Sequence, residues 1–327
     1  MFDLFENIDS MRLNFSEGGL FFMNVTLAVI MFGVALDIKI DNFRNIINYP
    51  KSAILGFGSQ FILLPALTFL LVLIINPPPS IAMGMILISA CPGGNISNFI
   101  SSLAKANVAL SVSLTAIATL SATLLTPLNY SLWGGLYVKY SERALHLNIP
   151  IEIDFWQMAQ TVFILLGIPL ILGMWVGNRF PDFTKRYIKK VKIASIILYM
   201  VFIFGAFYAN LEYMGVILIP IGFLVFLLNV QTLFTGYLVG TIGGVPRADR
   251  RSLSIETGIQ NSGLALILIF NPKLFNGIGG MAFMAAWWGI WQMISGLLLA
   301  ALLAKIRIPR AKEARVRIDS SKNKYNS

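Results

Sequence analysis

The chain has 327 residues, of which 57% are hydrophobic and 12% are charged, and its mean hydropathy is +0.75. These values exclude a soluble globular domain and indicate a polytopic membrane protein. The net charge of +10 does not indicate nucleic-acid binding, because the basic residues fall in short segments between apolar runs, as expected for loops that face anionic lipid.

The apolar stretches are long enough to cross a hydrocarbon core of about 30 Å, and they are too long and uniform for the strands of a membrane barrel. We therefore predict an all-α membrane protein with nine transmembrane helices. In chain order the predicted helices are 18–38, 50–76, 79–105, 107–128, 154–178, 190–210, 213–242, 250–271 and 277–305.

The segments outside these helices predict the orientation. Residues 1–17 lack the basic region of a cleaved signal peptide, so we expect them to remain as an extracytoplasmic segment. Residues 129–153 are predicted to form an outside loop, and the basic tail 306–327 is predicted to be cytoplasmic. We expect a multi-pass protein of the plasma (inner) membrane with its N-terminus outside.

Metal and disulfide chemistry is limited by composition. Cys91 is the single cysteine and His146 the single histidine, which excludes an internal disulfide and a site built from several histidines. We expect no cofactor.

Two predicted helices are interrupted by residues that disfavour a continuous helix. The stretches are CPGGNISN at 91–98 and IETGIQNSGLA at 255–265, about half a chain length apart. Pairing them divides the chain into two repeats, 18–128 and 154–305, related by an odd number of spans, so the second is inverted. Matched breaks in inverted halves are typical of the midplane binding site of secondary transporters. A structurally kinked helix relieved by its neighbours is the alternative for either break.

The ends of a broken helix have a defined chemistry. The N-terminal ends favour an anionic substrate, whereas free carbonyls, hydroxyls and a carboxylate favour a small hard cation.

Glu256 lies within a predicted membrane helix, where an acidic side chain costs roughly 2.5–3.5 kcal/mol on insertion scales. A bound cation or a proton would neutralise it. The alternative is that Glu256 lies near the cytoplasmic end of its helix and reaches water or pairs with Arg250 or Arg251.

Further polar residues share helix faces in apolar surroundings. Gln260 lies one turn from Glu256, and Ser111 and Thr115 are related in the same way. Serine and threonine often bond their own backbone, and Gln60 could form an ordinary interhelical hydrogen bond, so structural roles remain open for these residues.

Four stretches, CPGGNISN, NVALSVSLT, LLTP and SIETGIQNSGLA, together resemble the bile acid/sodium symporter (BASS) family. The resemblance implies a core domain, formed by the predicted helices 2–4 and 7–9, and a panel domain, formed by helices 1, 5 and 6. It also implies that the two discontinuous helices cross in the core, that two sodium ions bind behind the crossing, and that one domain moves against the other during alternating access.

The resemblance also implies the ligands. The first sodium site would use Ser97, Asn98, Ser111, Thr115 and Glu256, and the second would use Gln60, Glu256, Gln260 and the backbone carbonyls of Thr257 and Ile259. Substrate would bind near Asn95, Asn261, Ser262 and Gln292. Asn95 and Gln292 depart from what is expected in relatives, so the identity of the anion stays open.

We therefore expect a sodium-coupled symporter that imports an organic anion, either bile-acid-like or a small carboxylate, across the lipid bilayer. A proton-coupled transporter is the first alternative. An intramembrane enzyme is disfavoured because the chain lacks HExxH, GxSxG and a second membrane carboxylate beside Glu256. A passive channel fits a crossing of broken helices less well. The oligomeric state is not predicted.

Overall fold

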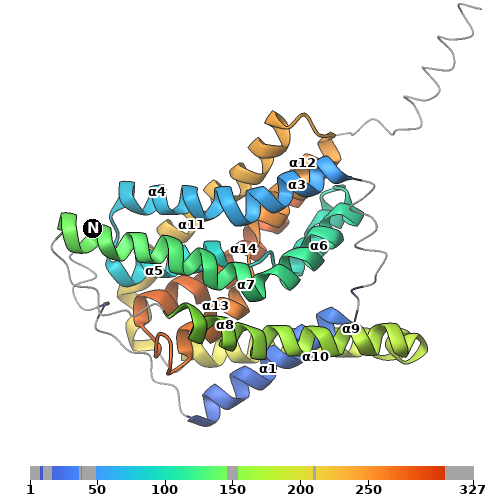
Figure 1. Cartoon of the computed structure of the whole chain (residues 1–327), viewed down its shortest axis with the longest axis horizontal. Coiled ribbons are helices and arrows are strands. Elements are labelled where there is room, and N and C mark those ends of the chain that lie inside the picture. Colours follow the sequence, from blue (N-terminus) through green and yellow to red (C-terminus); the bar gives the residue numbers. More distant parts are fainter. Residues whose placement is uncertain are drawn as a thin grey trace, which may run out of the picture.

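The computed structural model describes residues 8–9, 17–36, 38, 49–145, 154–208 and 211–305, and nearly all of this part of the chain is helical (Figure 1). Within it, five helical segments are long and apolar enough to cross a membrane. Asn24–Ala35 and Pro79–Ala90 form shorter apolar helices. The structure thus confirms an all-α membrane protein, while the count of nine spans and the inverted repeat stay predictions.

The helices, in chain order, are α1 (Glu17–Ala35), α3 (Pro50–Gly58), α4 (Leu64–Ile75), α5 (Pro79–Ala90), α6 (Ile96–Leu103), α7 (Val108–Tyr140), α8 (Phe155–Val162), α9 (Ile168–Arg179), α10 (Pro181–Tyr208), α11 (Leu211–Ile242), α12 (Arg247–Gly258), α13 (Ser262–Phe270) and α14 (Gly279–Lys305). Three π-helical turns continue or join them: η2 (Ser59–Leu63) between α3 and α4, η3 (Ser141–Leu145) after α7, and η4 (Phe163–Gly167) between α8 and α9.

Two predicted boundaries are wrong. Residues 129–145 were expected in a loop, but α7 and η3 continue through them, because Tyr130 and Tyr137 are fully buried and pack into the core. The helix expected at 190–210 begins at Pro181, since proline at the first position and Asp182 in the first turn favour a helix start even though the following turns are too basic for an apolar span. His146 and the tail 306–327 lie outside the described residues.

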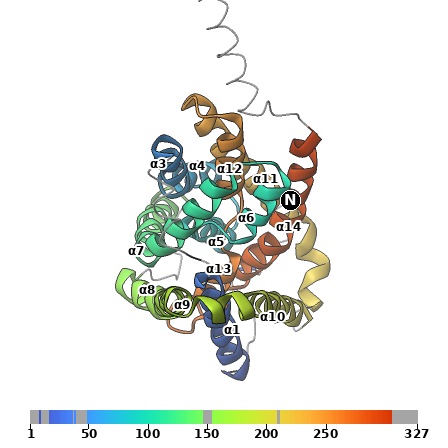
Figure 2. The ribbon, with the colours of Figure 1, turned by 90° about the vertical axis from the view of Figure 1, so that its right-hand side faces the viewer.

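The helices form two layers. α1, α8, α9 and α10 lie together along one side of the molecule, and α1 packs against both α9 and α10 (Figures 1 and 2). α3, α4 and α12 lie on the opposite side. This arrangement leaves α5 and α13, one half of each broken helix, in the interior.

α5 and α13 are enclosed by protein. Every residue of α5 from Ser80 to Ala90 is buried, as is every residue of α13 except Gly263. Irregular backbone at membrane depth is tolerated where protein covers it. The two breaks that follow α5 and precede α13 therefore lie in a setting that can hold unwound chain.

Candidate functional site

The two breaks meet each other in space. The Gly94 N–H donates to the carbonyl of Ile259 at 2.8 Å, and the Asn261 N–H donates to the carbonyl of Pro92, also at 2.8 Å. Gly93 and Gln260 form an antiparallel bridge between these bonds. Each unwound stretch thus satisfies backbone groups that the other leaves free, which explains how both are stable without lipid or water as partners.

Glycine is required at this crossing because the backbones approach closely. A Cβ on Gly94 would lie 2.9 Å from the Gln260 carbonyl oxygen. A Cβ on Gly93 would lie 3.1 Å from Glu256 Oε2, 3.2 Å from the Glu256 carbonyl oxygen and 3.8 Å from that of Ile259. The space beside Gly93 is therefore surrounded by oxygen atoms.

Glu256 is buried in α12, with 5% of its surface exposed, and three hydroxyls approach its carboxylate. Ser97 of α6 donates to Oε1 at 2.6 Å, and Ser111 of α7 donates to the same oxygen. Thr115, one turn further along α7, donates to Oε2 at 2.9 Å. The carboxylate therefore joins α6, α7 and α12 at one point.

The position of Glu256 argues against the alternative that its carboxylate reaches water or pairs with Arg250 or Arg251. Arg250 Nε donates to the carbonyl of Val245 at 2.7 Å, and Arg251 Nη1 donates to that of Ala104 at 2.8 Å. Both contacts lie nearer the start of α12, whereas the carboxylate is turned into the hydroxyl cluster.

Asn98 completes the group predicted as the first sodium site. Its Oδ1 accepts from Ser111 at 2.9 Å and lies 3.2 Å from the Thr115 hydroxyl. Ser101 Oγ, which the sequence analysis did not include, lies 3.1 Å from Ser111 Oγ. Ser101 follows Ser97 by one helical turn, a spacing that could have identified it.

The cluster is rich in oxygen. The single hydrogen of the Ser111 hydroxyl faces a Glu256 carboxylate oxygen and Asn98 Oδ1, two acceptors that carry no hydrogen of their own, and it cannot fully satisfy both. Carboxylate, amide and hydroxyl oxygens are the ligands of hard cations. In the described part of the chain, no three His, Cys, Asp or Glu side chains come together in an arrangement that could hold a metal ion.

The residues predicted for the second sodium site adjoin the crossing. Gln60 Nε2, on η2, donates to Gln260 Oε1 at 2.8 Å and to the carbonyl of Cys91 at 2.9 Å. Gln260 Nε2 donates to the carbonyl of Thr257 at 2.8 Å. The Ile259 carbonyl instead accepts the crossing bond from Gly94.

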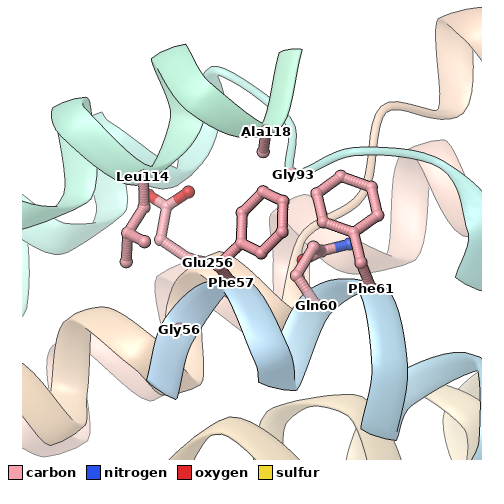
Figure 3. Close-up of a pocket in the computed structure, with 8 residues that line it drawn as sticks. All are labelled: Gly56, Phe57, Gln60, Phe61, Gly93, Leu114, Ala118 and Glu256. Atoms are coloured by element: carbon pink, nitrogen blue, oxygen red, sulfur yellow. The ribbon is translucent and has the colours of Figure 1, made fainter. Parts of the chain in front are cut away.

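A small cavity lies beside Gln60 and Glu256. It is lined by Gly56, Phe57, Gln60, Phe61, Gly93, Leu114, Ala118 and Glu256 (Figure 3). The amide of Gln60 and the carboxylate of Glu256 both reach this cavity (Figure 3). Gln60 of the second predicted site and Glu256, predicted for both sites, therefore line the same cavity.

Two further polar contacts support the residues of the second predicted site, and the sequence analysis did not identify them. Ser59 Oγ lies 2.9 Å from Thr257 Oγ1, and Asn229 Nδ2 of α11 donates to the Gly258 carbonyl at 3.0 Å, where α12 ends. Asn229 is a buried amide in an apolar helix, the same signal that identified Gln60.

The predicted substrate residues lie at the second break except for Asn95. Asn261 Oδ1 caps α13 by accepting from the Leu264 N–H at 3.1 Å. Gln292 Oε1 accepts from the Gln260 N–H at 2.8 Å, and its Nε2 lies 3.4 Å from Ser262 Oγ. Asn95 precedes α6 at the first break. Gln292 thus holds the unwound backbone in place.

The geometry defines a class of membrane protein. Two interrupted helices that cross at an enclosed oxygen-rich site are typical of ion-coupled secondary transporters.

Comparison with known proteins agrees with this class. The model of the Sodium Bile acid symporter family matches residues 24–216, more than half of the chain, and the chain belongs to this family. It is a family of transporters and not of enzymes. The sequence-based recognition of the family is confirmed.

Three relatives illustrate the range of similar proteins. The uncharacterized sodium-dependent transporter YocS of Bacillus subtilis is 29% identical over 90% of this chain and 88% of its own length. The probable chloroplastic sodium/metabolite cotransporter BASS1 of Arabidopsis thaliana is 30% identical over 75% of this chain and 58% of its own length. The human ileal sodium/bile acid cotransporter is 28% identical over 78% of this chain and 71% of its own length. The chain thus spans little more than half of the plant relative.

Proposed function

We propose that this protein is a sodium-coupled symporter that imports an organic anion by alternating access. One observation carries the proposal: the buried carboxylate of Glu256 is held by hydroxyls from α6 and α7 directly beside the crossing of the two breaks. A sodium ion at this point would neutralise a charge that is otherwise costly at membrane depth. The relatives described as sodium-dependent transporters or sodium cotransporters support the same ion.

Sodium has two places to bind in this proposal. The first uses Glu256 with Ser97, Asn98, Ser111 and Thr115, and the second uses Glu256 with Gln60, Gln260 and the carbonyls of Thr257 and Ile259. The described geometry supports the first set most directly, because hydrogen bonds connect its five side chains into one network. Ile259 would need to share its carbonyl with Gly94.

The substrate would be an organic anion near the helix ends at the crossing. α6 and α13 both begin at the breaks, so the positive ends of two helices lie near Asn95, Asn261 and Ser262. The names of relatives include both metabolite and bile acid cotransporters, which agrees with a bile-acid-like or small carboxylate substrate. Gln292 would fix the backbone of this region, because its Oε1 accepts a hydrogen bond from the Gln260 N–H.

Movement between the two layers would expose the substrate site alternately to each side of the membrane. α1, α8, α9 and α10 would form the panel, and the remaining helices would form the core. α1 already contacts the second break, since Asn261 Nδ2 lies 3.9 Å from the Met31 sulfur. We place the protein in the plasma membrane with its N-terminus outside and its C-terminus in the cytoplasm, from the distribution of lysine and arginine.

Uptake by proteoliposomes tests the function. Bile salts and small carboxylates would first be screened for stabilisation of the purified protein, in sodium and in potassium, because a ligand of the folded state raises its melting temperature. The compound that stabilises the protein in sodium alone should then accumulate in proteoliposomes under an inward sodium gradient. Accumulation driven by a pH gradient in sodium-free buffer would instead establish proton coupling through Glu256.

A further inference from the structure

A buried acidic residue outside the proposed ion sites connects the helices that carry them. Asp249 lies in the first turn of α12, and 4% of its surface is exposed. Its Oδ2 accepts from Ser52 Oγ of α3 at 2.6 Å, and its Oδ1 accepts from Asn107 Nδ2 at 2.9 Å. Asn107 is the N-cap of α7. One carboxylate therefore holds the beginnings of three helices.

Asn107 forms two further hydrogen bonds with α12 through its backbone. Its N–H donates to the Ala248 carbonyl at 3.2 Å, and its carbonyl accepts from Ser252 Oγ at 2.8 Å. Its Oδ1 accepts from the Leu110 N–H at 3.1 Å and so caps α7. The start of α7 thus has a single defined position on the first turns of α12.

The same turns of α12 also hold α6. Arg251, which is buried, donates from Nη1 to the carbonyl of Ala104, the residue that ends α6, at 2.8 Å. A cation at this end of a helix satisfies a free carbonyl and opposes the helix dipole favourably. We name Asp249, Arg251 and Ser252 the α12 clamp.

The clamp residues and their partners lie one or two helical turns from the proposed ion ligands on the same helices. Ser252 precedes Glu256 by one turn, Asn107 precedes Ser111 by one turn, and both contacts join the same two helices. Ser52 precedes Gln60 by two turns along α3 and η2. A shift of α7 by one residue would move its side chains by about 1.5 Å along the helix and rotate them by about 100°, which would separate the Ser111 and Thr115 hydroxyls from the carboxylate.

We propose that Asp249, acting with the rest of the α12 clamp, is a positioning residue for sodium binding, which aligns the ligands on α3, α6 and α7 with Glu256. The inference rests on the proposed function. Asp249 does not contact the ion in this account. It lowers the cost of binding because the oxygen atoms already lie together before sodium arrives.

The test is a sodium titration of the purified full-length protein, with potassium chloride replacing sodium chloride at constant ionic strength. The readout is the sodium midpoint, defined as the dissociation constant fitted to the dependence of melting temperature on sodium concentration, because stabilisation grows with ln(1 + c/Kd), where c is the sodium concentration. Loss of a buried hydrogen-bonded charge should raise that midpoint about tenfold or more in Asp249→Ala. Ser252→Ala is a milder change and should also raise the sodium midpoint. It provides the test if Asp249→Ala does not fold.

Ser254→Ala is the matched control. Ser254 is a buried serine of α12, and its hydroxyl donates to the Leu233 carbonyl of α11 at 2.8 Å, away from the clamp. A purely structural role for Asp249 would lower the melting temperature in potassium without moving the sodium midpoint. Midpoints of Asp249→Ala and Ser252→Ala equal to that of Ser254→Ala would overturn the inference alone. A wild-type protein that sodium does not stabilise would overturn the proposed function and this inference with it.

Discussion

Glu256 illustrates how far a single residue can be predicted. A carboxylate in an apolar helix predicts a partner, because the free energy of leaving it unpaired within a membrane is high. The structure supplies three hydroxyl partners, from Ser97, Ser111 and Thr115. Their convergence is a tertiary property, since the three come from two helices separated in sequence from α12.

Gly93 provides a test at the same scale. In Gly93→Ala the added methyl group would fill the space between Glu256 Oε2 and the Glu256 carbonyl, and the overpacking should weaken sodium binding by at least about fivefold. Isothermal titration with sodium measures the change. Gly135→Ala on α7 is the control, because a Cβ there meets no atom within 4 Å, and its sodium affinity should match the wild type. Equal affinities for both variants would show that no ion occupies the space beside Gly93.

The sequence could identify Ser111, Thr115, Gln60 and Gln260 as candidate site residues, because each lies in an apolar helix, where a polar side chain needs a hydrogen-bond partner or a ligand. Ser97 and Asn98 followed from the family resemblance instead. Asp249 gave no such signal: it lies among arginines in a stretch that has the composition of a solvated loop, and only the packing of α3 and α7 against α12 buries it. Burial of a charged residue beside a helix start depends on contacts distant in sequence.

The helices show which features an apolar pattern can identify. Residues that disfavour a continuous helix locate both breaks correctly: Pro92, Gly93 and Gly94 in the first, and Gly258, Asn261 and Gly263 in the second. The pattern does not reveal that the breaks bond to each other, or that η2 places Gln60 at the crossing. π-Helical turns occur often at functional sites, and they carry no simple sequence signature.

The extension of α7 beyond residue 128 is tested through Tyr137. Its side chain is fully buried, and its hydroxyl has no hydrogen-bond partner among the described residues. Tyr137→Phe should leave the free energy of unfolding unchanged or slightly higher, whereas Tyr137→Ala should lower it by about 3–5 kcal/mol. Denaturant titration in mixed micelles measures both. Equal stability of the alanine variant and the wild type would contradict the packing of this part of α7.

At the scale of the whole molecule, coupling follows from shared elements. α6 begins at the first break, at the proposed substrate site, and also carries Ser97 and Asn98 of the first sodium site. α12, which carries Glu256, ends at the second break, and α13 begins there. Sodium that fixes the crossing would therefore also fix both helix N-termini toward the substrate, and linkage requires that the substrate in turn tightens sodium binding.

The proposed division into a panel and a core would let sodium binding control the movement of one layer against the other. α1 of the proposed panel contacts the second break through Met31 and Asn261. The membership of the panel and the core remains a prediction from the family resemblance, because nothing in an apolar helix indicates which neighbour it will pack against.

Direct binding of radioactive sodium to the purified protein tests the central claim that Glu256 and its hydroxyl partners hold sodium. The wild type should bind sodium saturably, and Glu256→Gln should lose this binding, because both proposed sites share the carboxylate. Asp154→Asn is the control, since Asp154 is an exposed helix cap whose oxygen accepts from the N–H groups of Trp156 and Gln157. Retention of full sodium binding by Glu256→Gln would contradict the account.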